Sequence, residues 1–147
     1  MKSPSIYLVY PGNCEEAFDF YAETLGGHIS MKSRYRDMPA NPDFPPIPKT
    51  HQDLVMHITL DLVDGSIIQG SDRVSGFGPT LEVGNNFSVS IQTDGSQDAD
   101  RIHNALAENG IVTMPMQKTF WGAYFGSCQD RFGVNWMIAF NARQNQS

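Results

Sequence analysis

Cysteine is scarce in this sequence, and acidic residues outnumber basic ones. The 147 residues include 2 cysteines, and 10 lysines and arginines stand against 16 acidic residues, for a formal net charge of −6. Cys14 and Cys128 lie far apart, so they match neither a metal-binding knuckle nor a dense disulfide framework, and we expect buried thiols in a reducing, cytoplasmic location. Nucleic acids and anionic membranes select basic surfaces, and the acidic balance therefore predicts neither as a partner.

Long hydrophobic runs are also missing. No apolar stretch approaches the length of a membrane span, and the first residues, 1–5, lack the apolar region and cleavage site of a secretory signal. A chain of 147 residues buries roughly 70% of the surface that its unfolded form exposes, which suffices without disulfides or a structural metal. We therefore expect one soluble globular domain spanning residues 1–147.

The first half of the chain has the pattern of a strand, a helix and three further strands. Residues 5–9 are typical of a strand. Asn13 then stands where a helix N-cap is expected, Glu16 would complete a capping box, and Gly26 supplies a left-handed stop. The apolar residues of this helix recur at the spacing of one helical face. Three strand-type runs follow, at 28–35, 54–62 and 66–71.

The second half repeats this order. Residues 87–93 alternate apolar and polar side chains, as a half-buried strand does. Ser96 is expected to cap a second helix, and Gly110 is expected to end it. Strand-type runs again follow, at 111–117, 123–129 and 135–140.

Each half is therefore predicted to be one β-α-β-β-β module, over residues 5–72 and 86–140, with a linker at 73–85. Neither module buries a sheet face well by itself, so we expect the two to pair with their helices outside and a hollow inside. The predicted fold class is α+β, with a curved mixed sheet around a cavity that is the candidate site. Five of the 9 prolines fall within 39–48, which predicts a long exposed loop.

One turn and one tryptophan are expected to have structural roles and no role in ligand binding. Asp130 and Gly133 begin and end a four-residue turn, and the Asp130 side chain is expected to accept a hydrogen bond from the backbone two residues on. Strand alternation places Trp136 on the face opposite Met137, toward the helices. We therefore expect Trp136 in the core.

Four segments of the chain carry a family resemblance. They are YLVYPGNCEEAFDFYAETLGG (7–27), HITLDLVDGSIIQGSD (57–72), TFWGAYFG (119–126) and DRFGVNWMI (130–138). In order and over nearly the whole chain, they resemble the PhnB-like branch of the vicinal oxygen chelate superfamily, which includes glyoxalases and bleomycin-resistance proteins. The resemblance implies paired βαβββ modules, commonly in a homodimer. It leaves the activity open, because isomerases, dioxygenases, fosfomycin-modifying enzymes and non-catalytic drug-binding proteins share this scaffold.

The resemblance also implies where a metal would bind. In metal-dependent members, four strands each direct one His, Gln or Glu into the hollow. The matching positions in this sequence are Ile6, Gln69, Asn86 and Met137. A hydrocarbon, two amides and a thioether make a poor site for Ni, Zn, Mn or Fe. We therefore predict no metal ligands and no cofactor, with a divalent metal as the less favoured alternative.

Histidine offers another route to a metal or to acid–base chemistry. His57 alternates with the apolar Ile58 and Leu60, so it lines the hollow if the apolar residues pack on a helix. Three roles remain open for it: a hydrogen-bonded support of the cavity wall, a ligand-binding or catalytic acid–base group, and a metal ligand. The remaining histidines are expected on the solvated surface: His28, His51 and His103.

Aromatic side chains are the material that the sequence offers a ligand. Trp121 and Phe125 lie in one short run, and Tyr10 ends the first predicted strand. Such surfaces bind flat or apolar small molecules. With His57 and Gln69, these three residues make up the predicted ligand-binding set.

Two functions from different classes remain. The first is a metal-independent small-molecule binding protein with an aromatic-lined cavity. The second is a metal-dependent lyase, isomerase or dioxygenase-type enzyme whose unorthodox ligands include His57 and Gln69. The donor chemistry favours the first. Ubiquinone methylation, a role linked to relatives, lacks the glycine-rich loop and strand order of a methyl-donor fold, and a phosphonate would meet only Arg34 and Arg73.

Overall fold

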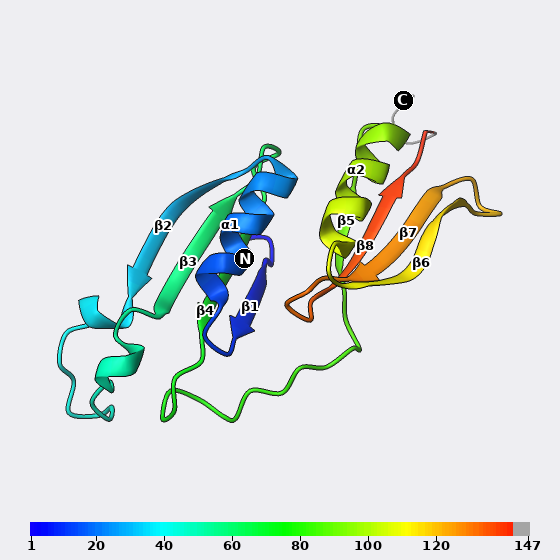
Figure 1. The fold of residues 1–147 in the computed structure, drawn as a ribbon. Helices are drawn as coiled ribbons and strands as arrows, with labels where there is room; N and C mark the ends of the chain where they lie inside the picture. Colours follow the sequence, from blue (N-terminus) through cyan, green and yellow to red (C-terminus); the bar gives the residue numbers. More distant parts are fainter. Residues whose placement is uncertain (143–147) are drawn as a thin grey trace. The chain divides into compact units, whose positions relative to one another are not determined.

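The computed structural model describes residues 1–142 and shows two units of the same design (Figure 1). Contacts within the chain group Met1–Glu82 into one unit and the residues from Val83 onward into the other. This boundary falls inside the segment 73–85 that the sequence predicts as a linker. No helix of the described part of the chain is long and apolar enough to span a membrane.

The first unit is one four-stranded sheet with a helix on one face (Figure 1). Its strand order is β1-β4-β3-β2, with β1 parallel to β4 and the other neighbours antiparallel. The elements are β1 (Ile6–Tyr10), α1 (Cys14–Leu25), β2 (His28–Arg34), β3 (Val55–Asp61) and β4 (Ile67–Asp72).

The second unit repeats this topology. Its order, β5-β8-β7-β6, again pairs the first strand in parallel with the last. The elements are β5 (Val89–Gln92), α2 (Ser96–Ala107), β6 (Ile111–Lys118), β7 (Tyr124–Gln129) and β8 (Asn135–Phe140). The repeat and the α+β class predicted from the sequence are therefore confirmed.

The start of α1 is capped by a distant carboxylate and not by Asn13. The Asn13 side chain makes no capping hydrogen bond, because φ −115° and ψ 26° hold its backbone outside the extended region of an N-cap. The Cys14 amide instead donates to Oδ1 of Asp72, at 2.9 Å, and the Val55 amide donates to Oδ2, also at 2.9 Å. Asp72 is 2% exposed, and burial raises the pKa of this carboxyl group. The predicted capping box is therefore wrong, whereas Gly26 ends the helix as expected, with φ 79°.

The ends of α2 also differ from the prediction. Ser96 is the first helical residue and Gly95 the N-cap, and α2 ends at Ala107, before Gly110. Gly110 serves a different purpose, since a Cβ atom there would collide with the carbonyl oxygen of Gln129 at the end of β7. Gly27 has the same relation to the carbonyl oxygen of Asp61 at the end of β3. Both glycines allow a close approach of two strands at the same place in the repeat.

Each unit packs its core between the helix and one face of the sheet. In the first unit, Phe18 and Tyr21 of α1 are fully buried against strand residues such as Ile58. In the second, Trp136 is fully buried, as the sequence predicts, and its Nε1 donates to Oδ2 of Asp130 at 2.9 Å. Within residues 1–142, the opposite face of each sheet carries no α-helix of its own unit.

One histidine prediction is wrong. His103 on α2 is 4% exposed, and its Nε2 lies 3.1 Å from the backbone carbonyl oxygen of Ser127. The residue was expected on the surface because it is polar and follows Ile102. A hydrogen bond to a strand carbonyl replaces the contacts with water that the ring loses on burial, as buried polar groups require.

The edge strands β2 and β6 pair irregularly with their neighbours. The β2–β3 ladder shifts register between Ile29 and Met31 and again between Ser33 and Arg34. The β6–β7 ladder shifts between Val112 and Met114 and again before Gln117. Both shifted strands lie at one edge of their sheet.

Candidate functional site

A hydrogen-bonded histidine lies on the open face of the first sheet. Ile58 and Leu60 are fully buried toward α1, so the half-buried His57 and Thr59 point to the other face. The Nδ1 of His57 lies 3.2 Å from the Tyr7 hydroxyl, and its Nε2 lies 3.1 Å from Oγ1 of Thr59. Both ring nitrogens therefore have a hydrogen-bonding partner.

Gln69 lies on the same open face. It is in register with Thr59 of β3 and with Tyr7 of β1, and its Oε1 accepts a weak hydrogen bond of 3.5 Å from the Ser5 hydroxyl. The structure thus brings His57 and Gln69 into one neutral polar cluster. Sequence reasoning missed Tyr7, although its alternation with the buried Leu8 was the signal that could have found it.

Tyr10 lies on the other face of this sheet. Its side chain is 1% exposed, and its hydroxyl donates to the Tyr21 hydroxyl of α1 at 2.9 Å. Its ring also meets the edge of Phe18, with centroids 6.1 Å apart. The sequence placed Tyr10 in the ligand-binding set because it is an aromatic residue at a strand end, but the parity of β1 turns it into the core.

The second unit carries a cavity of about 470 Å³ over the open face of its sheet. The Tyr124 hydroxyl donates to Asp100 of α2, so Phe125 and Ser127 must point to the opposite face. Within the described part of the chain, no charged side chain lines this cavity. The apolar side chains that line the open face are Met114, Phe125 and Met137, and the neutral polar ones are Asn85, Ser88, Thr113, Ser127, Gln129 and Asn135.

Trp121 does not line this cavity. It lies in the turn between β6 and β7, is 56% exposed, and packs edge-on against Phe120, which is 98% exposed. The turn is held by paired hydrogen bonds between Thr119 and Ala123. Of the two aromatic residues predicted from this run, the structure places only Phe125 at a cavity.

Neither cysteine has the setting of a nucleophile. Both thiols are free and buried, as the sequence predicts. Burial, with the Asp72 and Glu15 carboxylates beside it, raises the pKa of Cys14 far above its ordinary value. Burial, and then Asp130, raises the pKa of Cys128 to about 11. Because the thiolate is the reactive form, both side chains act as small buried hydrophobes.

The residues at the four positions matched to metal ligands do not fit a divalent cation. Ile6 alternates with the buried Leu8 and Tyr10, and so belongs to the helix-covered face. Asn86 is exposed in the loop before β5, and Met137 lines the cavity of the second unit as a soft thioether. Within residues 1–142, no group of three or more His, Cys, Asp and Glu side chains is placed to hold a metal ion.

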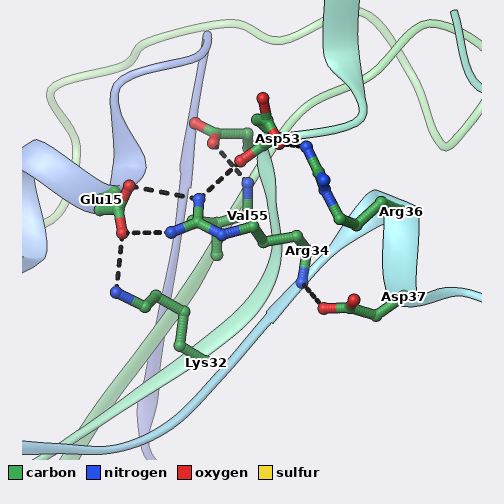
Figure 2. Close-up of polar contacts among 8 residues, drawn as sticks. Glu15, Lys32, Arg34, Arg36, Asp37, Asp53 and Val55 are labelled. Carbon is green, nitrogen blue, oxygen red and sulfur yellow. Dashed lines mark hydrogen bonds and ion pairs between the residues drawn. The ribbon is translucent and has the colours of Figure 1, made fainter. Parts of the chain in front are cut away.

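Arg34, one of the two arginines named for a phosphonate, is already ion-paired. Figure 2 shows the Arg34 guanidinium between Glu15 and the backbone of Asp53. Its two terminal nitrogens donate to the two Glu15 oxygens at 3.2 and 2.7 Å, and Lys32 donates to the same carboxylate at 2.7 Å. Arg73 donates to the Pro79 carbonyl oxygen. Neither arginine is therefore held ready for a phosphonate.

Replacing Glu15 with glutamine tests this cluster. Hydrogen bonds from Arg34 and then Lys32 lower the pKa of Glu15 from 4.5 to about 2. A lowered pKa contributes stability above pH 4.5 that is lost as the pH falls through about 2. Because the side chain is 38% exposed, solvent screening reduces the contribution to about 1 kcal/mol. We expect Glu15→Gln to lower the free energy of unfolding by that amount at pH 7, in urea titrations, with the difference vanishing near pH 2.

The neighbouring variant Glu16→Gln is the control, since Glu16 is exposed on the same turn of α1. It should match the parent protein within about 0.5 kcal/mol. A Glu15→Gln protein that is as stable as the parent at pH 7 would show that the cluster contributes nothing.

Comparisons with known proteins agree with this architecture. Residues 3–139 match the model of the family described as 3-demethylubiquinone-9 3-methyltransferase. Protein YjdN of Escherichia coli (strain K12) is 29% identical over 142 residues, which covers 91% of this chain and 92% of that protein. The crystal structure of protein PA1353 from Pseudomonas aeruginosa is 35% identical and superposes with a TM-score of 0.79, covering 95% of this chain and 98% of that one.

More distant structures share the fold. A PhnB protein from Bacillus cereus, a putative 3-demethylubiquinone-9 3-methyltransferase by name, is 23% identical and gives a TM-score of 0.74 over 95% of this chain and 99% of its own. Structures named as glyoxalases, glyoxalase-related or bleomycin-resistance proteins give TM-scores from 0.55 to 0.63 at 13 to 16% identity. With a family model that covers nearly all of the sequence and two units of the glyoxalase topology, the chain belongs to the 3-demethylubiquinone-9 3-methyltransferase-like family, the PhnB-like branch of the vicinal oxygen chelate superfamily.

Proposed function

We propose that the protein binds an uncharged small molecule without a metal, and that the ligand occupies the cavity over the open face of the second sheet. The observation that carries the proposal is the composition of this cavity, in which amides and hydroxyls stand beside Phe125 and two methionines with no charged side chain among them. Its volume of about 470 Å³ lies within the ordinary range of small-molecule sites.

The chemistry of the lining favours a neutral ligand for an energetic reason. A charged molecule that enters such a site loses hydration and gains no ionic partner, which is costly. A neutral molecule with an apolar body and a few polar groups replaces its water contacts with the amides and places its body on Phe125 and the methionines. The cytoplasmic location and the homodimer expected from the sequence belong to this proposal.

The residues of the matched positions favour binding over catalysis. The two functions named for relatives, methyl transfer and glyoxalase-type chemistry, require a methyl-donor fold and a set of metal ligands, respectively. The residues at the four matched positions here offer one thioether, two amides and a hydrocarbon. His57, the candidate for acid–base work, already has a partner on each ring nitrogen.

Nile red is a suitable probe, because it is uncharged and its fluorescence rises in an apolar environment. We expect a saturable rise in Nile red fluorescence with the parent protein. With Met137→Glu we expect the dissociation constant to be at least tenfold higher. Met137 is 36% exposed, so the substitution introduces a charge at the cavity without opening the core. The matched control is Val112→Glu, because Val112 is 51% exposed on the same sheet and does not line the cavity.

Two outcomes would overturn the proposal. One is an equal loss of Nile red binding in both variants, or none in either. The other is a stoichiometric metal, found by elemental analysis of untagged protein, whose removal abolishes Nile red binding. Retained binding in metal-free protein, together with a selective effect of Met137→Glu, would support it.

A further inference from the structure

The proline-rich segment of the first unit forms a second cavity, which the function proposed above does not use. This cavity measures about 640 Å³ and is lined by residues between Tyr35 and Gln52, which connect β2 to β3. It belongs wholly to the first unit.

Aromatic contacts hold the wall of this cavity in place. Phe44 stacks on Phe77 with ring centroids 5.2 Å apart and planes within 15°, and Tyr35 meets the same ring edge-on at 5.6 Å. The Tyr35 hydroxyl donates to the backbone oxygen of Asp72 at 2.7 Å, which ties this cluster to the end of β4. Pro45 lies so close to Gly76 that a Cβ atom at Gly76 would come within 2.6 Å of its ring. The segment is therefore docked on residues 74–78 of its own unit.

The lining is mostly apolar. Arg36 is the one charged side chain that lines it in the described chain, and it is ion-paired with Asp53. Asn41 and Gln52 supply neutral hydrogen-bonding groups. The rest of the wall is apolar and includes four proline rings, those of Pro39, Pro42, Pro45 and Pro46.

Proline rings select aromatic partners. Proline-rich segments dock into aromatic-lined grooves, because flat rings pack closely on the rigid pyrrolidine surface and little conformational entropy is lost. The same complementarity applies when the prolines belong to the protein and the aromatic ring to the ligand. Within this unit Phe44 and Phe77 already use aromatic stacking at the cavity wall, and a further flat ring would extend it.

We propose that the cavity of the proline-rich segment is a binding site for an uncharged aromatic small molecule. It is separate from the cavity of the second unit, and the two differ in the ligand they prefer: a flat aromatic ring here, an amphipathic neutral molecule there. The proposal does not depend on the function proposed for the second unit.

Methionine methyl groups report on the two cavities separately. Met38 lines the proline-rich cavity, whereas Met114 and Met137 line the other. In protein labelled with ¹³C at the methionine methyl groups, titration with indole should give a saturable shift of the Met38 signal. Cyclohexanol, which is uncharged but not aromatic, should bind at least tenfold more weakly by the same signal.

Two variants decide whether the shift reports this site. Ile47→Asp places a charge in the lining, and we expect it to weaken indole binding at least tenfold. Val63→Asp is the control, since Val63 is 85% exposed in the β3–β4 turn of the same unit. It should leave the indole titration unchanged.

The proposal is overturned if Met38 shows no saturable shift up to the solubility limit of indole. It is also overturned if cyclohexanol binds as well as indole, or if Ile47→Asp and Val63→Asp behave alike while both remain folded by circular dichroism. A shift confined to Met114 and Met137 would assign indole to the second unit and reject this site. If Met137→Glu had no effect on Nile red binding, the function proposed for the second unit would fail, but the indole test of this cavity would still stand.

Discussion

Replacing Asp130 with alanine is expected to lower the free energy of unfolding by about 3–5 kcal/mol, because one buried and two part-buried donors lose the carboxylate that accepts their hydrogen bonds. Asp130 is 2% exposed and follows β7 directly. Its Oδ1 accepts from the backbone amides of Phe132 and Val134 at 2.8 and 3.0 Å, and its Oδ2 accepts from Nε1 of Trp136 at 2.9 Å. One carboxylate thus fixes both the turn into β8 and the largest side chain of the core.

Urea titration followed by tryptophan fluorescence measures this effect, since both tryptophans lie in the second unit. Asp64→Ala is the matched control: Asp64 accepts from the Ser66 amide at 3.0 Å in the corresponding turn of the first unit, but it is exposed. It should cost about 1 kcal/mol or less. If Asp130→Ala fails to fold, Asp130→Asn keeps an acceptor for the turn and loses the one for Trp136, and should cost about half as much. An alanine variant within about 1 kcal/mol of the parent would refute the role of the carboxylate.

Gly70→Val is expected to destabilise the first unit by about 3 kcal/mol or more through overpacking. Gly70 lies in the middle of β4, between β1 and β3. A Cβ atom there would lie 2.7 Å from the Leu8 carbonyl oxygen and 2.7 Å from Cε1 of Phe18. The first obstacle is backbone of the neighbouring strand, and the second is a fully buried ring of α1. Strand and helix must therefore move together to make room.

Far-UV circular dichroism during urea titration reports this loss for the whole chain. Gly84→Val is the control, because only the Asn86 side chain, at 3.7 Å, would approach a Cβ atom at that position. It should change stability by no more than about 0.5 kcal/mol. A Gly70→Val protein as stable as the control would mean that α1 packs less tightly on β4 than the structure shows.

Local patterns in the sequence predict the elements well but their ends less well. The spacing of apolar residues predicts both helices, and the turn after Gln129 follows from an aspartate and a glycine placed as a type I turn requires. The cap of α1 could not be predicted, because its acceptor is Asp72, which lies 58 positions away from Cys14 in the chain. The sequence shows a local candidate, Asn13, and the tertiary structure provides a better one.

The candidate site was harder to predict because it depends on which face each strand buries. His57 lies on the open face, as its alternation with Ile58 and Leu60 predicts, and Gln69, which the family resemblance singled out, lies on the same face. The face of Tyr10 could not be predicted, because in β1 an aromatic residue suits either face of the sheet. Trp121 lies in a turn, where strand alternation gives no guidance. The neutral cavity of the second unit arises from three strands and a loop, and no single segment reveals it.

The register shifts in β2 and β6 have a consequence for solubility. Outer strands present unpaired backbone groups that invite another chain to add as a further strand, the first step of aggregation. Repeated shifts interrupt the regular spacing that such an addition requires. Charged side chains at Lys32 and Arg34 on β2, and Pro115 within β6, which offers no amide hydrogen, reinforce the interruption. These two edges are therefore protected against uncontrolled strand addition.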